Sequence, residues 1–584
     1  MPWAKKGNIF NLVFLSTLGV SNMNVGDSEP CSIFCDGPIL HAVELSGMFD
    51  DSKTFVDMPL KFDPSVVEAR FRALNGTVGK GIPVEKLEDF VNENFDKAGS
   101  DLESFQPGDW NPNPPFLKRL ESQPKLHKWA AEVHKLWLVL GRKPSADVKS
   151  NPLQHSLLWT PNPIVVPGGR FRESYYWDTF WILKGLVVSD MLTTATGVVE
   201  NLLYFCEKFG FVPNGGRSYY LTRSQPPLLS SMVRVVYEAL MADDQEGNAG
   251  KFLEHAVPIL RKEYVFWTTR RRANMEKYAP LCTYNAETKL PRPESYREDY
   301  QLAHEHGNRS AKERENLYKN IAAAAESGWD FSSRWFADGK TLGTVNSANI
   351  IPVDLNSYML RFELNMAYFY DQPSFRSNGK GLGKSGVFFD AAVTRYRAME
   401  KWLWNDRRRS WSDFNMSSSG HSDVVAVSDY LPLWAFSVPS LQSSAAFNHS
   451  HMLGSLGSLQ TSGVVGKAGY LKSTTTGGTG QQWDSPNAWA CMQHLMVEGL
   501  LSFQAPQAEK ETATAHAMGK SIASKWIETN FEAYAKAGYM YEKYDADTMG
   551  KGGGGGEYKP QVGFGWTNGV ALVFLNESLY ATPR

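Results

Sequence analysis

The stretch LHKWAAEVHKLWLVLG, residues 126–141, gives the clearest indication of the fold. Its apolar residues recur at steps of three and four, as on one face of an α-helix, and the run stops at a glycine. Residues 198–210 and 252–267 show the same periodicity, and similar stretches occur at 389–404, 488–503 and 512–530. The strict alternation typical of strands is scarce. The sequence therefore predicts an all-α protein.

Long polar connectors rich in glycine and proline lie between these helical stretches. They cover residues 106–116, 160–172, 212–228, 283–297, 472–487 and 550–567. Connectors of this length inside a compact domain usually carry function. Because one follows nearly every pair of predicted helices, the pattern indicates a helical toroid whose loops converge on one end.

The composition is globular and argues against nucleic-acid or membrane-surface binding. The chain has 584 residues, of which 42% are hydrophobic, and a formal net charge of -2. Polyanionic partners favour a basic face, which this balance does not provide. We interpret the two arginine runs, residues 270–272 and 407–409, as solvated helix ends. The 18 Trp and 24 Tyr residues tilt the case toward a carbohydrate ligand, although aromatic residues fill cores more often than sites.

The first residues resemble a targeting segment. Lys5 and Lys6 precede an apolar run from Ile9 to Val20, and small and polar residues follow. We therefore predict a signal peptide over residues 1–24 and a secreted protein. Since no other segment is long and apolar enough to cross a bilayer, we expect no membrane span.

The cysteines and the glycosylation triplets fit this prediction. Cys31 and Cys35 lie just after the predicted signal peptide, where a small disulfide loop fits an exported protein. A metal site is disfavoured because no second Cys or His cluster accompanies them. Cys206 falls in an apolar helical pattern that predicts a buried thiol. Potential N-glycosylation sites occur at Asn75, Asn308, Asn415, Asn448 and Asn576.

A stretch of another kind, PGGRFRESYYWDTF at residues 167–180, combines five aromatic rings with charged groups. Aromatic faces can lie against the C–H faces of a pyranose, while Arg170, Glu173 and Asp178 offer charge-assisted hydrogen bonds to hydroxyls. This mixture suits a sugar-binding cleft. The alternative is a half-buried helix start with aromatic core residues and surface ion pairs.

Three further tracts repeat this chemistry in the connectors. Residues 210–227, 291–296 and 481–490 carry polar and aromatic groups of the same kinds, namely Asn214, Arg223, Gln225, Arg292, Glu294, Trp483, Asp484 and Trp489. Each tract alone could be a turn with a helix cap, and Asp484 would serve well at a helix start.

Two carboxylates lie in surroundings suited to acid–base chemistry. Asp330 stands between Trp329 and Phe331, where partial desolvation would raise its pKa and favour the protonated form that a general acid requires. Glu542 precedes a run of five glycines, whose freedom suits a mobile loop or a close approach of backbone to a ligand. Spacing alone cannot choose a catalytic pair among 62 acidic residues.

Nucleotide-binding motifs fail on inspection. The segment GKGLGKSG at residues 379–386 has Asn378 where a phosphate-binding loop needs glycine. The glycines at residues 552–556 have neither a strand pattern before them nor a helix after them, as a dinucleotide fingerprint requires.

The tracts together carry a family resemblance. In chain order they are TFVDMPLKFDP, PGGRFRESYYWDTF, GFVPNGGRSYYLTRSQPP, ESGWDFSSRW, QQWDSPNAWA, EKYD, GGGGGEY and GFGWTNG. Their order and separations closely resemble those of the trehalases, the inverting glycoside hydrolases that cleave α,α-trehalose. The resemblance runs from about residue 31 to residue 576. Departures are slight: Phe180 stands where many members carry Tyr, and Cys491 replaces a common Pro.

The resemblance implies a single (α/α)6 barrel over residues 25–584, with the active site in the loops at one end. It implies that Asp330 is the general acid that protonates the glycosidic oxygen and that Glu542 is the general base that activates water from the opposite face. Residues that match the family's substrate-binding positions are Arg170, Phe171, Tyr175, Trp177, Asp178, Asn214, Arg223, Gln225, Arg292, Glu294, Gly328, Trp489 and Glu557, with Trp483 also in the pocket wall.

The implied reaction is hydrolysis of trehalose to two glucose molecules with inversion, without a metal or organic cofactor. Inversion leaves room for water, so the two carboxyl groups are expected about 6.5 to 9.5 Å apart. Arg170, Arg223 and Arg292 would bind sugar hydroxyls and help to hold nearby carboxylates, Glu542 included, in the ionised form.

Three alternatives remain open at this point. A glucoamylase-like hydrolase acting on other α-glucosides would share the fold and the chemistry. A sugar-binding protein would keep the arginines and aromatics without a catalytic acid and base, and a structural protein would give no reason for polar-aromatic tracts in loops. The sequence does not indicate the oligomeric state.

Overall fold

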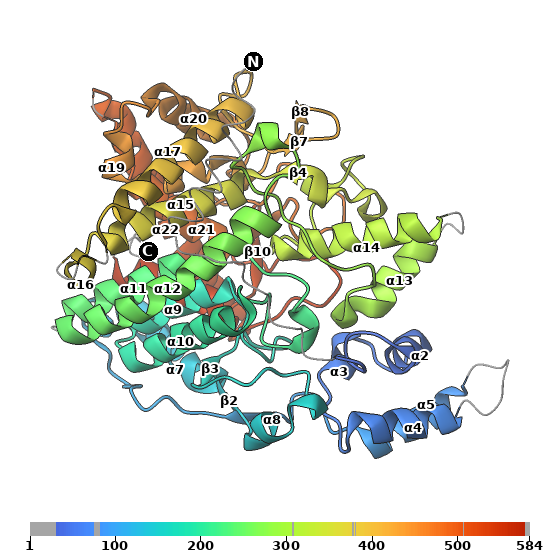
Figure 1. Ribbon diagram of the computed structural model, residues 1–584. Helices are drawn as coiled ribbons and strands as arrows, with labels where there is room; N and C mark the ends of the chain where they lie inside the picture. Colours follow the sequence, from blue (N-terminus) through green and yellow to red (C-terminus); the bar gives the residue numbers. More distant parts are fainter. Residues whose placement is uncertain are drawn as a thin grey trace.

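The computed structural model describes residues 31–74, 82–243, 245–305, 309–376, 379, 381–505 and 507–577. Helices dominate this part of the chain, and its strands are only two to four residues long (Figure 1). The predicted all-α class is confirmed. The predicted signal peptide and the triplets at Asn75 and Asn308 lie outside the described residues.

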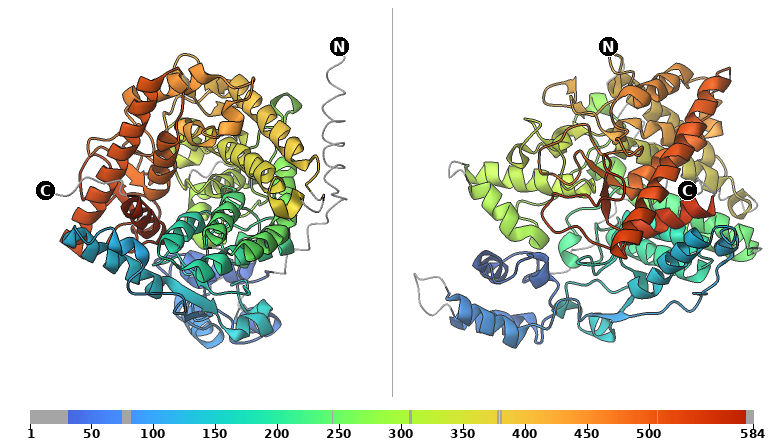
Figure 2. Two further views of the ribbon diagram at one scale, coloured as in Figure 1. Left: turned by 90° about the vertical axis from the view of Figure 1, so that its left-hand side faces the viewer. Right: turned by 180° about the vertical axis from the view of Figure 1, so that it is seen from behind.

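Six helices of the described chain form a closed inner ring. Each contacts the next one, and the last contacts the first. In order around the ring they are α9 (Asp178–Val188), α11 (Leu229–Ala242), α15 (Val353–Tyr370), α18 (Pro432–Ala435), α21 (Ala490–Leu501) and α23 (Gly565–Asn576). Figure 2 (left) shows the helices arranged around a common centre.

A second layer of helices packs around this ring, and each of its members contacts an inner helix. The outer helices are α7 (Pro124–Leu140), α10 (Leu192–Phe209), α12 (Glu246–Arg270), α17 (Lys384–Trp402), α20 (His449–Thr461) and α22 (Glu509–Ala537). Two concentric layers joined by alternating connections are the (α/α)6 barrel that the resemblance implied. This prediction is therefore confirmed.

The stretch that predicted the fold forms the outer helix α7. Leu126, Trp129, Val133 and Trp137 are buried on one face of that helix, as its periodicity requires. The second periodic stretch forms α10, which ends at Gly210 with a left-handed φ of 81°. Glycine adopts this left-handed conformation without strain because it has no Cβ. The glycine that follows the periodic stretch therefore indicated the end of the helix correctly.

The inner helices α9 and α23 pack unusually closely. A Cβ built on Gly185 would lie 2.6 Å from the Cα atom of Gly569, and one on Gly569 would lie 2.1 Å from the carbonyl oxygen of Trp181. Both glycines are therefore needed for this contact. It fixes the start of α9, where the pocket residue Asp178 lies.

The N-terminal part of the described chain forms a second hydrophobic cluster beside the loop end of the barrel. It contains α2 (Pro38–Ser46), α3 (Lys53–Val56), α4 (Pro64–Leu74) and α5 (Val84–Asn94), and Tyr175, Tyr219, Tyr220 and Tyr296 of the barrel loops join its buried residues. Figure 1 shows α2 beside α13 (Tyr296–His304), which precedes α14 (Ala311–Glu326), and α4 and α5 farther from both. That residues 25–584 act as one domain stays a prediction.

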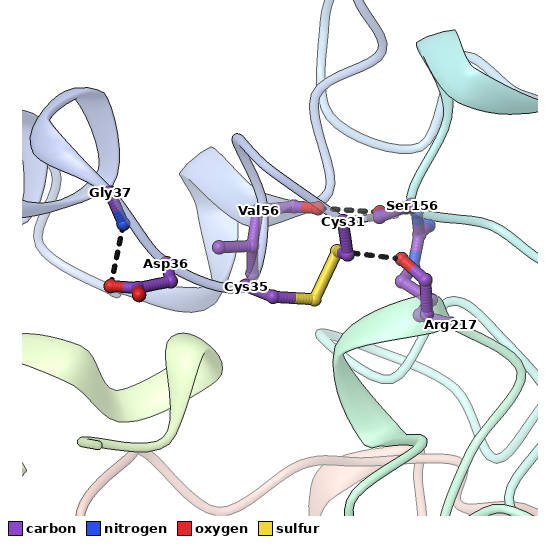
Figure 3. Close-up of a disulfide and its surroundings, with 8 residues drawn as sticks. Cys31, Cys35, Asp36, Gly37, Val56, Ser156 and Arg217 are labelled. Atoms are coloured by element: carbon purple, nitrogen blue, oxygen red, sulfur yellow. Dashed lines mark hydrogen bonds between the residues drawn. A yellow bond between two sulfur atoms is a disulfide. The ribbon is translucent and has the colours of Figure 1, made fainter. Parts of the chain in front are cut away.

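A disulfide between Cys31 and Cys35 closes a short loop at the start of this segment, a pairing that the sequence left open (Figure 3). The Sγ atom of Cys31 lies 3.2 Å from Oγ of Ser218, and Oγ of Ser156 donates a 2.6 Å hydrogen bond to the carbonyl oxygen of Val56. These contacts tie the segment to the barrel loops. The thiol of Cys206 is buried, as predicted.

Short strands and single-turn helices complete the connectors. Three strands pair in the order β1 (Leu102–Ser104), β2 (Gly141–Pro144) and β3 (Ile164–Val165), and three more in the order β4 (Ile350–Ile351), β7 (Phe414–Asn415) and β8 (Gly420–His421). The two remaining pairs are β5 (Trp404–Asn405) with β6 (Ser410–Trp411) and β9 (Asn487–Trp489) with β10 (Lys543–Asp545), all antiparallel. The short helices are α6 (Pro115–Lys118), α8 (Ala146–Ser150), α16 (Pro373–Arg376) and α19 (Pro439–Gln442).

One surface prediction was wrong. Arg271, in the first arginine run, is only 1% exposed. Its Nε and Nη2 atoms donate hydrogen bonds of 2.9 Å to the buried carboxylate of Glu326 at the end of α14. A buried carboxylate requires a paired cation. The carboxylate here belongs to Glu326, which is 55 positions from Arg271 and lies on another helix. Within the described ranges, no helix combines the length and apolar character needed to cross a membrane.

Candidate active site

The loop end of the barrel contains a polar pocket. The residues that the family resemblance implied for the site all line this one pocket, namely Arg170, Phe171, Tyr175, Trp177, Asp178, Asn214, Arg223, Gln225, Arg292, Glu294, Gly328, Asp330, Trp483, Trp489, Glu542 and Glu557. Two other candidates from the sequence do not line it. Glu173 is buried in ion pairs with Lys53 and Arg217, and Asp484 accepts hydrogen bonds from serine and threonine side chains.

Asp330 enters the pocket from the turn that follows α14. Burial raises the pKa of its carboxyl group to about 7, and the nearby charge of Glu557 acts in the same direction, whereas Arg292 opposes both. The rise has the direction expected from its aromatic sequence neighbours. The side chain can therefore carry a proton near neutral pH, as a general acid must.

Glu542 enters the pocket from a different segment of the chain, immediately before β10. This strand pairs with β9, so that Lys543 lies opposite Trp489. Glu542 is 1% exposed, and its carboxylate accepts hydrogen bonds from Oη of Tyr558 at 2.7 Å and from the N–H of Gln561 at 3.0 Å. Two donors compensate the buried negative charge, which suits a general base.

Three arginines surround the pocket, and each is held by a carboxylate. Arg170 pairs with Asp51 at 2.7 Å, and Arg223 pairs with Glu294 at 2.5 Å. Arg292 binds Asp299 at 2.7 Å and Glu557 at 3.0 Å, both through Nη2. Fixed guanidinium groups present their remaining N–H groups to a ligand without further ordering.

These pairings correct one expectation from the sequence. The arginines were expected to help hold Glu542 ionised, but the donors to its carboxylate in the described residues are Tyr558 and the backbone of Gln561. Burial alone would raise the pKa of Glu294, but the charges of Arg223 and Arg292, together with its hydrogen bonds, lower it. Arg170 likewise lowers the pKa of Asp51, so the expectation is met for these two nearby carboxylates. The ion pairs join loops far apart in the sequence, so spacing could not reveal them.

Tryptophans form the apolar wall of the pocket. The ring of Trp483 stacks between those of Trp329 and Trp489, with centroids 4.8 Å and 4.3 Å away. Trp177 packs beside this stack, 5.8 Å from Trp483. Gly328 has a φ of 75°, and a Cβ there would lie 2.4 Å from the ring of Trp177. Both faces of the Trp483 ring are thus covered by neighbouring tryptophans, and the stack forms an apolar wall.

Asp178 is a third carboxyl group in the pocket, at the start of α9. Burial raises its pKa well above the usual value, and the charges of Glu542 and Asp330 act in the same direction. The protonated form is therefore favoured. In that form the group offers a hydroxyl donor and adds no further negative charge to the site.

Several pocket residues were missed by sequence reasoning, namely Tyr220, Ser295, Ala325, Gln482, Tyr558, Phe564 and Trp566. Gln482 was visible inside the tract 481–490 but carried no distinguishing chemistry. In the structure its Nε2 donates to the carbonyl oxygen of Asp330, and its Oε1 accepts from the buried Nζ of Lys543 at 2.6 Å. Gln482 thus joins the segments of the two carboxyl groups.

The five glycines pack closely against other backbone of the chain; the predicted mobile loop or close approach to a ligand stays a prediction. The N–H of Gly553 donates to the carbonyl oxygen of Lys543 at 2.9 Å, and the N–H of Gly556 donates to that of Gly480 at 3.0 Å. A Cβ on Gly555 would lie 2.5 Å from the oxygen of Gly480. The run therefore packs against the tract at 480–487 and places Glu557 at the pocket.

A metal site is not evident in the part of the chain that the structure describes. No group of three or more His, Cys, Asp or Glu side chains there is arranged to hold a metal ion. The chemistry available to the pocket is thus acid–base chemistry by carboxyl groups and hydrogen bonding by arginines.

A helical barrel whose loop-end pocket combines acidic side chains, fixed arginines and a tryptophan wall is typical of a glycoside hydrolase. The chain belongs to the trehalase family, because the family model described as Trehalase matches residues 47–578. It is 37% identical to the trehalase of Oryctolagus cuniculus and 36% identical to that of Homo sapiens. Each comparison covers 98% of this chain and 94% of the relative.

A relative from another kingdom is equally similar. The probable trehalase of Oryza sativa subsp. japonica is 39% identical, over 90% of this chain and 92% of the relative. Among solved structures, the neutral trehalase of Saccharomyces cerevisiae matches with a TM-score of 0.57 and 23% identity, over 72% of this chain and 74% of that one. This structural match supports the barrel fold.

Proposed function

We propose that this protein is an α,α-trehalase that hydrolyses trehalose to two glucose molecules with inversion of configuration. The observation that carries the proposal is the arrangement of Asp330 and Glu542, two carboxyl groups in different environments that line the same arginine-rich pocket. One has its pKa raised to about 7 by burial, and the other accepts two hydrogen bonds that stabilise its charge. Membership of the trehalase family supports the choice of substrate.

In the proposed reaction Asp330 donates its proton to the glycosidic oxygen. The bond from this oxygen to one anomeric carbon breaks, and the departing glucose keeps its α configuration. Water attacks that carbon from the opposite face while Glu542 accepts its proton, so the second product is β-glucose. This geometry needs a separation of about 6.5 to 9.5 Å between the two carboxyl groups.

The pocket walls have distinct parts in this proposal. Arg170, Arg223 and Arg292 bind sugar hydroxyls, since each retains N–H groups beyond those bound to its carboxylate partner. The tryptophan stack forms an apolar wall beside the space that the sugars occupy. Gln225, which accepts a 3.0 Å hydrogen bond from the backbone of Trp177, offers its amide N–H groups to the substrate.

Proton NMR of trehalose digestion tests both the substrate and the stereochemistry. Equal initial amounts of α- and β-glucose are expected, whereas two α-glucose molecules would exclude inversion. Asp330→Ala and Glu542→Gln should abolish turnover while near-ultraviolet circular dichroism stays unchanged. Near-native activity in either variant would contradict the assigned roles. Preferential release of glucose from maltose would favour the glucoamylase-like alternative.

We also propose that the protein is exported and glycosylated. The Cys31–Cys35 disulfide supports this proposal, because such bonds persist in oxidising compartments. Asn415, Asn448 and Asn576, in the remaining triplets, are half-buried. Sequencing the N-terminus of protein recovered from the culture medium of a eukaryotic host tests the cleavage, and a mass shift on endoglycosidase treatment tests the glycans. An N-terminus at Met1, or retention inside the cell, would contradict export.

A further inference from the structure

Asp51 lies outside the tracts that carry the family resemblance, yet it contacts a residue of the pocket. Its two carboxylate oxygens accept hydrogen bonds from Nε and Nη2 of Arg170, at 2.8 Å and 2.7 Å. This is the bidentate arrangement in which a planar guanidinium is most strongly oriented. The two residues are 119 positions apart, and Asp51 belongs to the N-terminal segment rather than to the barrel.

The segment around Asp51 is itself rigidly attached. The backbone N–H of Lys53 donates a 3.0 Å hydrogen bond to Oδ1 of Asp51. The Nζ atom of Lys53 is completely buried and pairs with Asp57 at 2.7 Å and with Glu173 at 2.8 Å. Because Glu173 lies in the tract 167–180, the segment that carries Asp51 and the segment that carries Arg170 are joined at two points.

From Arg170 the contacts continue to the general base. The guanidinium carbon of Arg170 lies 4.6 Å from the ring centroid of Tyr558, and the backbone N–H of Arg170 donates a 3.0 Å hydrogen bond to Oε1 of Gln561. Tyr558 and the N–H of Gln561 are the two donors to Glu542. Gln561 also accepts a 2.9 Å hydrogen bond from the backbone of Glu542 through its carbonyl oxygen.

We propose that Asp51 is a positioning residue of the active site, which orients Arg170 for the sugar and, through Arg170, supports the segment that holds Glu542. This inference rests on the proposed function, because it assigns Arg170 and Glu542 their parts in trehalose hydrolysis. The N-terminal segment then completes the catalytic pocket in addition to covering the barrel loops. Charge agrees with the geometry: although burial alone would raise the pKa of Asp51, the hydrogen bond and charge of Arg170 lower it below the usual value.

A plain structural role for the pair makes a different prediction from a positioning role. A structural pair, once lost, lowers the folded and active fraction of the enzyme, which reduces kcat per total protein and leaves KM unchanged. A lost positioning residue leaves the folded enzyme with a misoriented Arg170, so KM rises. The ratio of KM values is therefore the deciding readout.

The test compares Asp51→Asn with the matched control Asp50→Asn in the full-length protein. Asp50 is the preceding residue and is exposed, so its substitution removes one carboxylate at nearly the same place. For Asp51→Asn we expect KM for trehalose to rise about 10-fold and kcat/KM to fall by 10- to 100-fold, the range for a misplaced binding group. Asp50→Asn should stay within twofold of wild type. Asp51→Glu, which keeps the carboxylate, should recover part of the loss.

The chain to the base is tested by a double-mutant cycle. Gln561→Ala should lower kcat, and its effect should be smaller in the Asp51→Asn background, because the two residues support the same segment. Equal KM values for Asp51→Asn and Asp50→Asn, or fully additive effects of Asp51→Asn and Gln561→Ala, would overturn the proposal. Absence of trehalose hydrolysis by the wild-type protein would instead refute the proposed function, so the two failures are distinguishable.

Discussion

The phenolic hydroxyl of Tyr558 donates a 2.7 Å hydrogen bond to Oε1 of Glu542, the proposed general base. Tyr558 follows Glu557 directly after the five glycines, so the loop that brings Glu557, a proposed sugar-binding residue, to the pocket also brings a donor to the proposed base. The pKa of Tyr558 is raised well above its usual value by burial and by the neighbouring charges of Glu542 and Asp330. The phenol therefore keeps its proton and remains a donor over the working pH range.

Tyr558→Phe should lower kcat with little change in KM. The substitution keeps the ring against Arg170 and removes only the hydroxyl. A hydrogen bond to a charged group contributes about 1.5 to 3 kcal/mol, which corresponds to a fall in kcat of about 10- to 150-fold. Steady-state kinetics on trehalose measure the effect. Tyr539→Phe, at a ring that is 41% exposed, serves as the control, and equal kcat values for the two variants would contradict the role of Tyr558.

The activity should fall on the alkaline side with an apparent pKa near that of Asp330. A general acid must be protonated, and burial raises the pKa of this group to about 7. The proton is present below pH 7 and is lost as the pH rises through that value, so kcat/KM should decline above about pH 7. A pH profile of kcat/KM measures the limb, and a profile that stays flat to pH 9 would argue against Asp330 as the acid.

The raised pKa of Asp330 also predicts that the stability of the protein falls as the pH rises. The folded state binds the proton of Asp330 more tightly than the unfolded chain does, so ionisation of this group lowers the free energy of unfolding as the pH rises from about 4 to 7. Asp330→Asn removes that cost and should be more stable than wild type at pH 8, by a few kcal/mol at most. The difference should shrink as the pH falls below the usual value of 3.8, where both the folded and the unfolded wild type carry the proton. Denaturant unfolding at several pH values measures it, and a pH-independent difference would contradict the raised pKa.

Gly328→Ala should reduce both stability and activity. A Cβ at this position would lie 2.4 Å from the ring of Trp177, on a residue with a φ of 75°. Gly339→Ala is a matched control, since Gly339 has a φ of 68° with no atom within 4 Å of the added Cβ. The control should lose only about 1 to 2 kcal/mol for the left-handed backbone and keep its kcat/KM. Gly328→Ala should lose more stability and at least about 10-fold in kcat/KM, because Trp177 must move.

Activity should persist after exhaustive chelation. The proposed mechanism uses carboxyl groups and arginines only, and the described residues contain no cluster suited to a metal ion. Dialysis against EDTA followed by the trehalose assay tests this expectation, with re-addition of divalent cations as the control. A loss of activity that cations restore would contradict it.

Much of the site could be predicted from sequence because its residues lie in compact tracts of unusual composition. Arg170 and Asp178 stand within a single run of fourteen residues, and Trp483 and Trp489 within another. The aromatic neighbours of Asp330 indicated its desolvation. These signals are local, so a linear reading could find them and a family resemblance could give them roles.

Other parts of the site depend on contacts between distant segments and left no local signal. Asp51 and Arg170 are 119 positions apart, and Gln482 reaches the carbonyl oxygen of Asp330 across 152 positions. The burial of Arg271 was misjudged for the same reason, since its partner Glu326 lies on another helix. A run of arginines is expected at the surface from sequence alone, but a buried carboxylate on another segment can bind one of them in the interior.

The sequence by itself determined the helical class and the tracts that contribute most of the pocket, because helical periodicity and local composition are properties of short stretches of chain. The tertiary structure decided which groups act on one another. Only the closed ring of inner helices brings the turn after α14, the β9–β10 pair and the N-terminal segment to one end of the barrel. The pKa of Asp330, the donors to Glu542 and the orientation of Arg170 are set there, because charge, burial and hydrogen bonding depend on distance in space rather than on position in the chain.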